Sequence, residues 1–187
     1  MDKLLELDGN ILLWIQDNLR VEALNPVIKF ITHLGDAGLV WIVAIAALLA
    51  FRKTRKAGIM CVMALIGSVI INNLILKNLI ARTRPYEVVD GLTRLIEKQS
   101  DFSFPSGHTG SSIAVGVVMF KELPKKYGIP AITLGILISL SRLYVGVHYP
   151  TDVIVGAIAG AFSAIISIRL YTYYENKKGL KSGERVE

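Results

Sequence analysis

The chain has 187 residues and a net charge of +6, with 52% hydrophobic and 19% charged residues. Its length fits one domain, and its mean hydropathy of +0.50 is high for a soluble globular domain. The basic residues form short clusters at the ends of apolar segments, which argues against a nucleic-acid-binding surface. The only cysteine, Cys61, lies inside an apolar run, so an intrachain disulfide is excluded.

The first predicted element is a helix over residues 4–19. Six apolar side chains fall on roughly one face of this helix: Leu4, Leu5, Ile11, Leu12, Ile15 and Leu19. The pattern is typical of an amphipathic helix that lies at a membrane interface, and a sixth membrane span is the alternative. A second short helix is predicted to open at Asn25 and Pro26 and to end within Thr32–Asp36.

Five runs without charged residues follow, over residues 37–51, 57–76, 102–120, 127–141 and 153–168. A membrane span needs about 20 apolar residues, and three runs are shorter, so a buried core of a soluble protein is an alternative. Five such runs would leave little solvent-facing helix surface in so small a protein. Flanking Lys and Arg can also extend short spans by snorkelling.

The sequence therefore predicts an all-α fold. We expect a polytopic membrane helical bundle with five to six transmembrane helices and an N-terminal amphipathic helix. Residues 1–174 would form this membrane-embedded domain. Residues 175–187 are polar and charged and are predicted to be a flexible cytoplasmic tail.

The placement of positive charge predicts the orientation in the membrane. Basic residues cluster after the first, third and fifth runs: Arg52, Lys53, Arg55, Lys56, Lys121, Lys125, Lys126, Lys177, Lys178, Lys181 and Arg185. In a five-span topology these segments share one side, which the positive-inside rule makes cytoplasmic. The chain would then be a multi-pass protein of the cytoplasmic membrane, with loops 81–101 and 142–152 on the extracytoplasmic face. Most charged residues of loop 81–101 are interpreted as a solvated surface.

Five cationic or histidine side chains fall together on the extracytoplasmic side: Lys77, Arg84, His108, Arg142 and His148. Taken singly, a Lys or Arg at the end of a span is usually an interfacial anchor, and a histidine there is an ordinary polar residue. Ionisable residues at membrane depth are costly and usually mark a functional site. Their joint placement therefore predicts a site that binds or attacks an anion.

The pair His148 and Asp152 is a candidate nucleophile with its orienting group. Pro150 is tolerated at the first position of a helix, so the fifth run would begin there, with His148 at its mouth and Asp152 in its first turn. The carboxylate could bond one imidazole nitrogen and leave the other as a lone-pair nucleophile. The alternative is that Asp152 only complements the positive end of the helix.

The stretch "PSGH", residues 105–108, is a candidate anion site. If the third helix begins near Pro105, the amides of Ser106, Gly107 and His108 are free donors at a helix N-terminus. Gly107 lets the backbone approach a ligand closely, and His108 could act as a general acid on a leaving oxygen. The alternative is an ordinary helix cap by Ser106.

Three segments together resemble the signature of the type 2 phosphatidic acid phosphatase family. They are "KNLIARTRP" (Lys77–Pro85), "PSGH" (Pro105–His108) and "SRLYVGVHYPTD" (Ser141–Asp152). The family includes membrane lipid phosphatases and soluble vanadium haloperoxidases. The chain looks like the membrane branch, similar to bacterial phosphatidylglycerophosphatase B and undecaprenyl-diphosphatases. The order and placement of the motifs extend the resemblance from about Thr32 to Arg169.

The resemblance implies specific roles. His148 would attack phosphorus to form a phosphohistidine, Asp152 would orient it, and His108 would protonate the departing oxygen before water hydrolyses the intermediate. The implied phosphate-binding residues are Lys77, Arg84, Ser106, Gly107 and Arg142. No metal or other cofactor is implied, and the sequence shows no evident metal-ligand cluster. Every motif position is present, so an active enzyme is expected.

The predicted function is therefore an integral-membrane phosphatase acting on the phosphate monoester or diphosphate of a lipid. Undecaprenyl diphosphate ranks first among the substrates that the resemblance suggests, before phosphatidylglycerol phosphate, phosphatidic acid and lipid A phosphates. The alternative is a non-catalytic membrane protein that binds or transports an anionic lipid, which would not need the pair His148 and Asp152. A soluble haloperoxidase would have amphipathic helices, which these runs do not form. The oligomeric state is left open.

Overall fold

The computed structural model describes the backbone of residues 3–183 and the side chains of residues 3–178. The described residues are helical or irregular and contain no strand, which confirms the all-α prediction. The helices are α1 (Lys3–Leu19), α2 (Asn25–Leu34), α3 (Leu39–Ala50), α4 (Arg55–Ser68), α5 (Lys77–Ile80), α6 (Pro85–Val88), α7 (Gly107–Glu122), α8 (Lys125–Tyr144) and α9 (Pro150–Gly183). Shorter elements are η1 (Glu22–Leu24), η2 (Asp36–Gly38) and the π-helical stretch η3 (Val69–Leu76), which joins α4 to α5.

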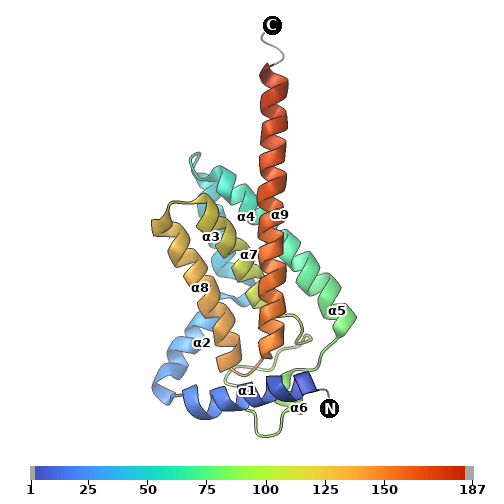
Figure 1. The fold of residues 1–187 in the computed structure, drawn as a ribbon. Helices are drawn as coiled ribbons and strands as arrows, with labels where there is room; N and C mark the ends of the chain where they lie inside the picture. The colour runs from blue at the N-terminus through green and yellow to red at the C-terminus, as the bar shows by residue number, and fades with distance from the viewer. Residues whose placement is uncertain (1–2, 184–187) are drawn as a thin grey trace.

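Helix α7 is the centre of the bundle and packs against α4, α8 and α9 (Figure 1). Small residues allow these close crossings, as is usual between membrane helices. A Cβ atom at Gly160 of α9 would collide with the carbonyl oxygen of Gly110 of α7. One at Gly135 of α8 would lie 2.9 Å from the carbonyl oxygen of Ser112. The glycines thus bring backbones of neighbouring helices into contact.

The outer surface of the bundle is apolar, while polar side chains lie inside. On α9, Ile154, Ile158, Phe162 and Leu170 are each more than half exposed. Buried polar side chains between the helices include Ser68, Asn72, Ser112, Ser139, Ser163 and Ser167. Such a distribution requires an apolar solvent, because exposed apolar surface of this extent is unfavourable in water.

The described residues contain three helices that are long and apolar enough to cross a membrane: residues 55–88, Lys125–Tyr144 and 150–178. A fourth candidate is the pair formed by residues 22–34 and 36–50, which is bent by 51°. The five predicted runs lie on α3, α4 with η3, α7, α8 and α9, but α3 has 12 residues and α7 has 16. The count of five to six spans therefore stays a prediction, whereas three to four candidate spans within one helical bundle are found in the described residues.

Helix α1 crosses one end of the bundle instead of running along it (Figure 1). Its inner side buries Leu12 together with Asp8 and Gly9, and Leu4 and Trp14 are more than half exposed. The helix is therefore amphipathic, but the side that contacts the bundle includes a carboxylate. The predicted apolar face and the observed buried side share only part of their residues.

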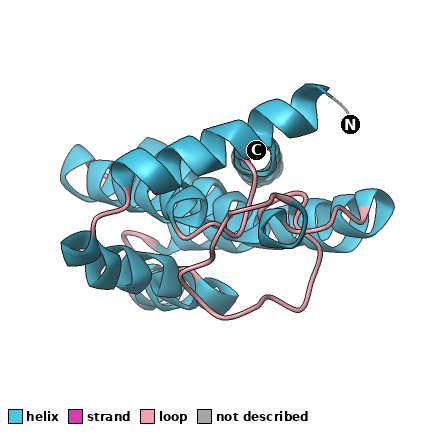
Figure 2. Ribbon diagram, turned by 90° about the horizontal axis from the view of Figure 1, so that it is seen from below, coloured by secondary structure: helices cyan, strands magenta, loops and turns pink. Residues whose placement is uncertain are grey.

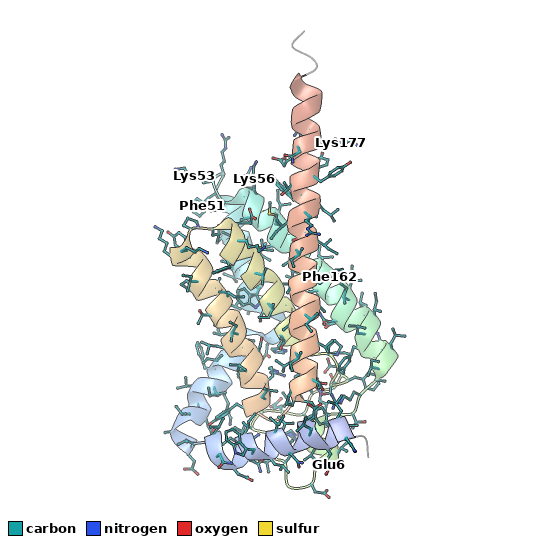
Figure 3. All side chains as sticks on the ribbon, viewed as in Figure 1. Glu6, Phe51, Lys53, Lys56, Phe162 and Lys177 are labelled. Carbon is teal, nitrogen blue, oxygen red and sulfur yellow. The ribbon has the colours of Figure 1, made fainter. Side chains whose placement is uncertain are left out.

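The opposite end of the bundle carries the basic clusters. Figure 3 shows Lys53, Lys56 and Lys177 at that end, far from Glu6 of α1. Helix α9 continues to Gly183, so the predicted domain boundary at residue 174 falls within a helix. The flexible tail stays a prediction, and its residues 184–187 lie outside the described part of the chain.

Candidate active site

The long loops gather at the α1 end of the molecule (Figure 2), where they enclose a cavity of about 450 Å³. Its polar wall contains Lys77, Arg84, Gln99, Asp101, Gly107, His108, Arg142 and His148. Its apolar wall is formed by residues of α3, α4 and η3, among them Ile42, Leu65, Ile66, Val69 and Ile70. The fold therefore joins residues of all three motifs in one half-polar, half-apolar cavity.

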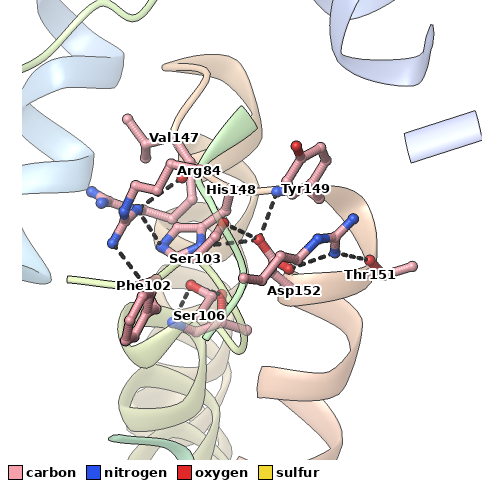
Figure 4. A network of polar contacts seen from close by, with 12 residues as sticks. Arg84, Phe102, Ser103, Ser106, Val147, His148, Tyr149, Thr151 and Asp152 are labelled. Atoms are coloured by element: carbon pink, nitrogen blue, oxygen red, sulfur yellow. Dashed lines mark hydrogen bonds and ion pairs between the residues drawn. The ribbon is translucent and has the colours of Figure 1, made fainter. Parts of the chain in front are cut away.

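His148 and Asp152 lie as predicted at the beginning of α9, which starts at Pro150. His148 Nδ1 lies 3.4 Å from Asp152 Oδ2, and Nε2 lies 3.3 Å from Arg84 Nη1 (Figure 4). A guanidinium can only donate hydrogen bonds, so Nε2 is the nitrogen with the lone pair and Nδ1–H faces Asp152. Nε2 of His148, on the side of Arg84, is thus an acceptor.

His148 is also held in its neutral form. It lies between α8 and α9 and is 1% exposed. Burial, with the positive charges of Arg84 and Arg142, lowers the pKa of its imidazole to about 3, although the hydrogen bond with Asp152 acts in the opposite direction. A neutral imidazole that carries its lone pair on Nε2 has the electronic state that a nucleophile needs.

The carboxylate of Asp152 is fixed by more partners than the sequence suggested. Oδ2 accepts hydrogen bonds from Ser103 Oγ at 2.5 Å and from the Tyr149 amide at 2.9 Å. Oδ1 accepts from Arg82 Nη1 at 2.8 Å. Asp152 is fully buried, and these bonds fix the orientation of the group that orients His148.

Arg82 corrects the interpretation of loop 81–101 as solvated surface. Its side chain is 15% exposed and pairs with both Asp152 and Asp8. Its guanidinium also stacks on the ring of Tyr149, with its central carbon 3.7 Å from the ring centroid. Asp8 additionally accepts hydrogen bonds from the amide and hydroxyl of Thr151. The N-terminal helix is therefore connected to the nucleophile through Arg82 and Asp152.

Lys77 and Arg84 share a second acidic partner that was missed, Asp101. Lys77 Nζ donates to Asp101 Oδ2 at 2.5 Å, and Arg84 Nη2 donates to Oδ1 at 2.5 Å. Burial raises the pKa of this carboxyl group, but Lys77 and Arg84 outweigh burial and lower the pKa to about 2. Asp101 is half exposed. Its two oxygens contact the two cations in the manner of two oxygens of a phosphate.

Arg142 is the most buried cation of the site, with no exposed surface. Its Nη1 donates to Thr32 Oγ1 at 2.7 Å, and Nη2 lies 3.5 Å from Gln99 Oε1. Its Nε is buried without a hydrogen-bond partner in the described part of the chain. A buried guanidinium with spare donors on a cavity wall fits an anion.

The stretch from Ser106 to His108 agrees in part with its prediction. Ser106 caps α7, since its Oγ accepts from the Thr109 amide at 3.4 Å and the Thr109 hydroxyl at 3.0 Å. Ser106 is fully buried and is not part of the cavity wall, whereas Gly107 and His108 are. A Cβ at Gly107 would lie 2.8 Å from Asn73 Oδ1, so the glycine also serves the packing of η3.

The described residues show no group of three or more His, Cys, Asp or Glu side chains arranged to hold a metal ion. The cations that surround the cavity come instead from the α4–η3–α5 segment, the loop before α6, and α8. The structure thus brings together Lys77, Arg84, Gly107, His108, Arg142, His148 and Asp152, and it leaves Ser106 behind them as a cap.

Comparisons with known proteins identify the family to which the chain belongs. Residues 56–176 match the family model of the PAP2 superfamily. The chain is 34% identical over 151 residues to an undecaprenyl-diphosphatase of Sulfolobus acidocaldarius, covering 81% of this chain and 72% of that protein. It is 35% identical over 150 residues to phosphatidylglycerophosphatase B of Bacillus subtilis, covering 74% and 70%.

The fold agrees as well. The crystal structure of a transmembrane PAP2-type phosphatidylglycerolphosphate phosphatase from Bacillus subtilis superposes with a TM-score of 0.68 and 29% identity, covering 95% of this chain and 88% of that one. The resemblance drawn from the three motifs is thereby confirmed. The chain belongs to the PAP2 superfamily as a multi-pass membrane phosphatase.

Proposed function

We propose that the chain removes a terminal phosphate from a membrane lipid, through a phosphohistidine on His148. The observation that supports this most strongly is the state of His148. It is buried on the wall of the cavity, its Nδ1 lies 3.4 Å from Asp152 Oδ2, and its Nε2 lies 3.3 Å from Arg84 Nη1 and therefore carries the lone pair. A protein that only bound an anionic lipid would not need an imidazole lone pair oriented by a buried carboxylate.

The reaction has two steps in this proposal. Nε2 of His148 attacks phosphorus, the bond between phosphorus and the leaving oxygen breaks, and His108 gives that oxygen a proton. A water molecule then attacks phosphorus, the P–N bond breaks, and His108 accepts the proton of the water. His148 returns to its neutral form, and inorganic phosphate leaves.

The cations supply electrostatic stabilisation of the phosphoryl group in both steps. Lys77, Arg84 and Arg142 come from three separate elements and line one cavity, and the amide of Gly107 lies at the N-terminus of α7. Charge develops on the equatorial oxygens in the transition state, where fixed donors stabilise it most. Three cations are enough to neutralise a phosphate dianion, so we expect activity in the presence of a chelator.

The apolar wall of the cavity supports a lipid substrate. A chain that extends from the phosphate along Ile42, Ile66 and Ile70 would reach the outer surface of the bundle, where these helices meet lipid. Of the similar proteins, one is an undecaprenyl-diphosphatase and another a phosphatidylglycerophosphatase. We propose undecaprenyl diphosphate as the first substrate to test, followed by phosphatidylglycerol phosphate.

The proposed orientation places the site on the extracytoplasmic face of the cytoplasmic membrane, with five spans formed by α3, α4 with η3, α7, α8 and α9. Support comes from the basic residues at the end of the bundle away from the site (Figure 3). A cysteine introduced at Gly91, in the background Cys61→Ser, should react with a membrane-impermeant thiol reagent from outside intact cells. Labelling only from the cytoplasmic side would contradict this orientation.

The function is tested by phosphate release from a panel of lipid phosphates by the purified protein. Wild type should release phosphate from at least one lipid. His148→Ala should lose most of this activity on every lipid, and His108→Ala should lose most of it on lipid monophosphates. Binding of the lipids without release by wild type would favour the alternative of a lipid-binding or lipid-transport protein. Full activity of His148→Ala would refute the mechanism but not the function.

A further inference from the structure

A carboxylate that belongs to none of the three motifs contacts His108. Asp36 lies in η2, the short segment between α2 and α3, and its Oδ1 is 2.8 Å from His108 Nε2. Its second oxygen, Oδ2, is 2.7 Å from Nδ1 of His33. The side chain of His108 is 17% exposed and those of Asp36 and His33 more than half. One carboxylate therefore bridges two of the three histidines.

The backbone around Asp36 is shaped for this contact. A Cβ at Gly35 would lie 2.7 Å from His108 Cδ2 and 2.8 Å from Ile138 Cγ2, so only glycine lets the segment approach the imidazole. Ala37 and Gly38 both adopt left-handed conformations, with φ of 50° and 68°, and such a conformation is uncommon for alanine. The 51° bend between the two helical segments occurs here. The chain thus turns sharply at the point where Asp36 meets His108.

We propose that Asp36 is a positioning residue for His108 and that His33 holds Asp36 in place. The proposal rests on the role of His108 as proton donor in the proposed function. The carboxylate accepts a hydrogen bond from Nε2–H of His108, which leaves Nδ1 as the nitrogen that exchanges a proton with the leaving oxygen and then with water. In the described part of the chain, no hydrogen bond of Nδ1 competes with this exchange.

The charge around His108 explains the need for a carboxylate. Ionisable groups on the same cavity or in contact with the ring are Asp36, Lys77, Arg84, Asp101, Arg142 and His148. The guanidiniums of Arg84 and Arg142 line the same cavity as His108 and repel its imidazolium form, whereas the carboxylate of Asp36, 2.8 Å from Nε2, attracts it. The protonated form, which donates the proton, is therefore stabilised by Asp36, the carboxylate in direct contact with the ring.

If Asp36 positions His108, the effect of Asp36→Asn on kcat should depend on the leaving group of the substrate. A general acid matters most when the leaving oxygen is strongly basic and little when it is weakly basic. Farnesyl monophosphate loses an alcohol, whereas farnesyl diphosphate loses a phosphate monoester, which is a much weaker base. Asp36→Asn should therefore reduce kcat for the monophosphate by about 10- to 100-fold. It should reduce kcat for the diphosphate by less than about threefold, with KM nearly constant for both.

The experiment measures kcat and KM of purified full-length protein on these two substrates. Asp36→Glu should recover part of the activity, and His33→Asn, which keeps a donor, should be closer to wild type than His33→Ala. The basic limb of the pH profile of kcat should move to lower pH in Asp36→Asn, because the imidazolium loses its partner. Asp90→Asn, an exposed carboxylate in the loop between α6 and α7, is the matched control and should behave as wild type.

Equal losses on both substrates in Asp36→Asn would indicate a purely structural role and overturn the inference, as would wild-type kinetics on both. His108→Ala separates this failure from a failure of the proposed function. If His108→Ala shows the leaving-group dependence and Asp36→Asn does not, only the role of Asp36 is wrong. If His108→Ala shows none, the proposed proton donor is wrong and the inference falls with it.

Discussion

Arg82 Nη2 lies 2.7 Å from Asp8 Oδ2, although the two residues are 74 positions apart in the sequence. The other terminal nitrogen of Arg82 donates to Asp152, which faces the nucleophile His148. Asp8 is 2% exposed and belongs to the helix that crosses the end of the bundle. The N-terminal helix is thus a support of the active site.

Loss of this ion pair should lower both stability and turnover. Asp8→Asn leaves Arg82 with one of its two carboxylates, and removal of one partner of a buried charged hydrogen bond costs about 1–3 kcal/mol. We expect a lower Tm in detergent and about a tenfold lower kcat, with KM nearly constant. Glu6→Gln changes an exposed carboxylate on the same helix and is the control. Equal Tm and kcat values in Asp8→Asn and Glu6→Gln would argue against this support.

The protonation of His148 can be measured directly, because the chain has three histidines. In the variant with His33→Gln and His108→Gln, His148 is the only one left, and nitrogen NMR of its imidazole reports its protonation. The folded-state pKa of about 3 lies below the ordinary value of 6.5. The ring should therefore remain neutral, with one N–H, at pH 5. A titration midpoint near 6.5 would contradict the buried neutral nucleophile.

The lowered pKa of His148 also determines how this residue changes the stability of the fold with pH. The unfolded chain binds a proton at His148 below about pH 6.5, and the folded chain does not bind it until about pH 3. The contribution of neutral His148 to stability is thus present above pH 6.5 and is lost as the pH falls toward 3. In His148→Gln, the decrease of Tm between pH 6.5 and pH 3 should therefore be smaller than in wild type.

Asp101 should compete with phosphate for Lys77 and Arg84. Its carboxylate contacts both cations and, with a pKa of about 2, is ionised at every pH at which the enzyme is assayed. Asp101→Asn removes the competing charge, so inorganic phosphate and vanadate should inhibit about three- to tenfold more strongly, or by roughly 1 kcal/mol. The inhibition constants of Asp101→Asn and Asp90→Asn are compared from pH 6 to 8. Weaker inhibition of Asp101→Asn would show that Asp101 positions the cations instead.

The close glycine contacts between helices predict that two Gly→Ala substitutions lower Tm to different extents. Gly160→Ala places a methyl group against the backbone of Gly110, which cannot move without displacing α7. Overpacking of this kind costs about 1–3 kcal/mol. Gly67→Ala, also within a helix, places its methyl group 3.4 Å from Ser163 Cβ, an ordinary contact. The Tm in detergent should fall clearly in the first variant and little in the second.

The predicted parts of the site are those that local sequence determines. His148 and Asp152 are one helical turn apart at a helix start that Pro150 marks, so their proximity follows from spacing. Ser106 as a helix cap likewise follows from its neighbours. We group Lys77, Arg84 and Arg142 because they fall on the same side of the predicted membrane topology: Lys77 closes the second apolar run, Arg84 lies in the loop that follows, and Arg142 follows the fourth run. Segments that end on one side of a small bundle lie close together in space.

The missed residues depend on contacts between distant segments. Asp8 reaches Arg82 across 74 positions, and Asp36 reaches His108 across 72. The charged residues of loop 81–101 resembled a solvated surface, since a sequence does not show that Arg82 is covered by α1 or that Asp101 turns toward Lys77. An acidic residue on the buried side of an amphipathic helix, such as Asp8, was the one local signal available.

The phosphohistidine is the centre of this account, and rapid-quench trapping of the enzyme with a lipid labelled on its terminal phosphate tests it most directly. Wild type should carry label that is lost in acid and kept in base, on the peptide that contains His148. His148→Ala should carry none, and the label on wild type should decay as inorganic phosphate appears. Turnover without any labelled protein, or label that persists in His148→Ala, would contradict the mechanism.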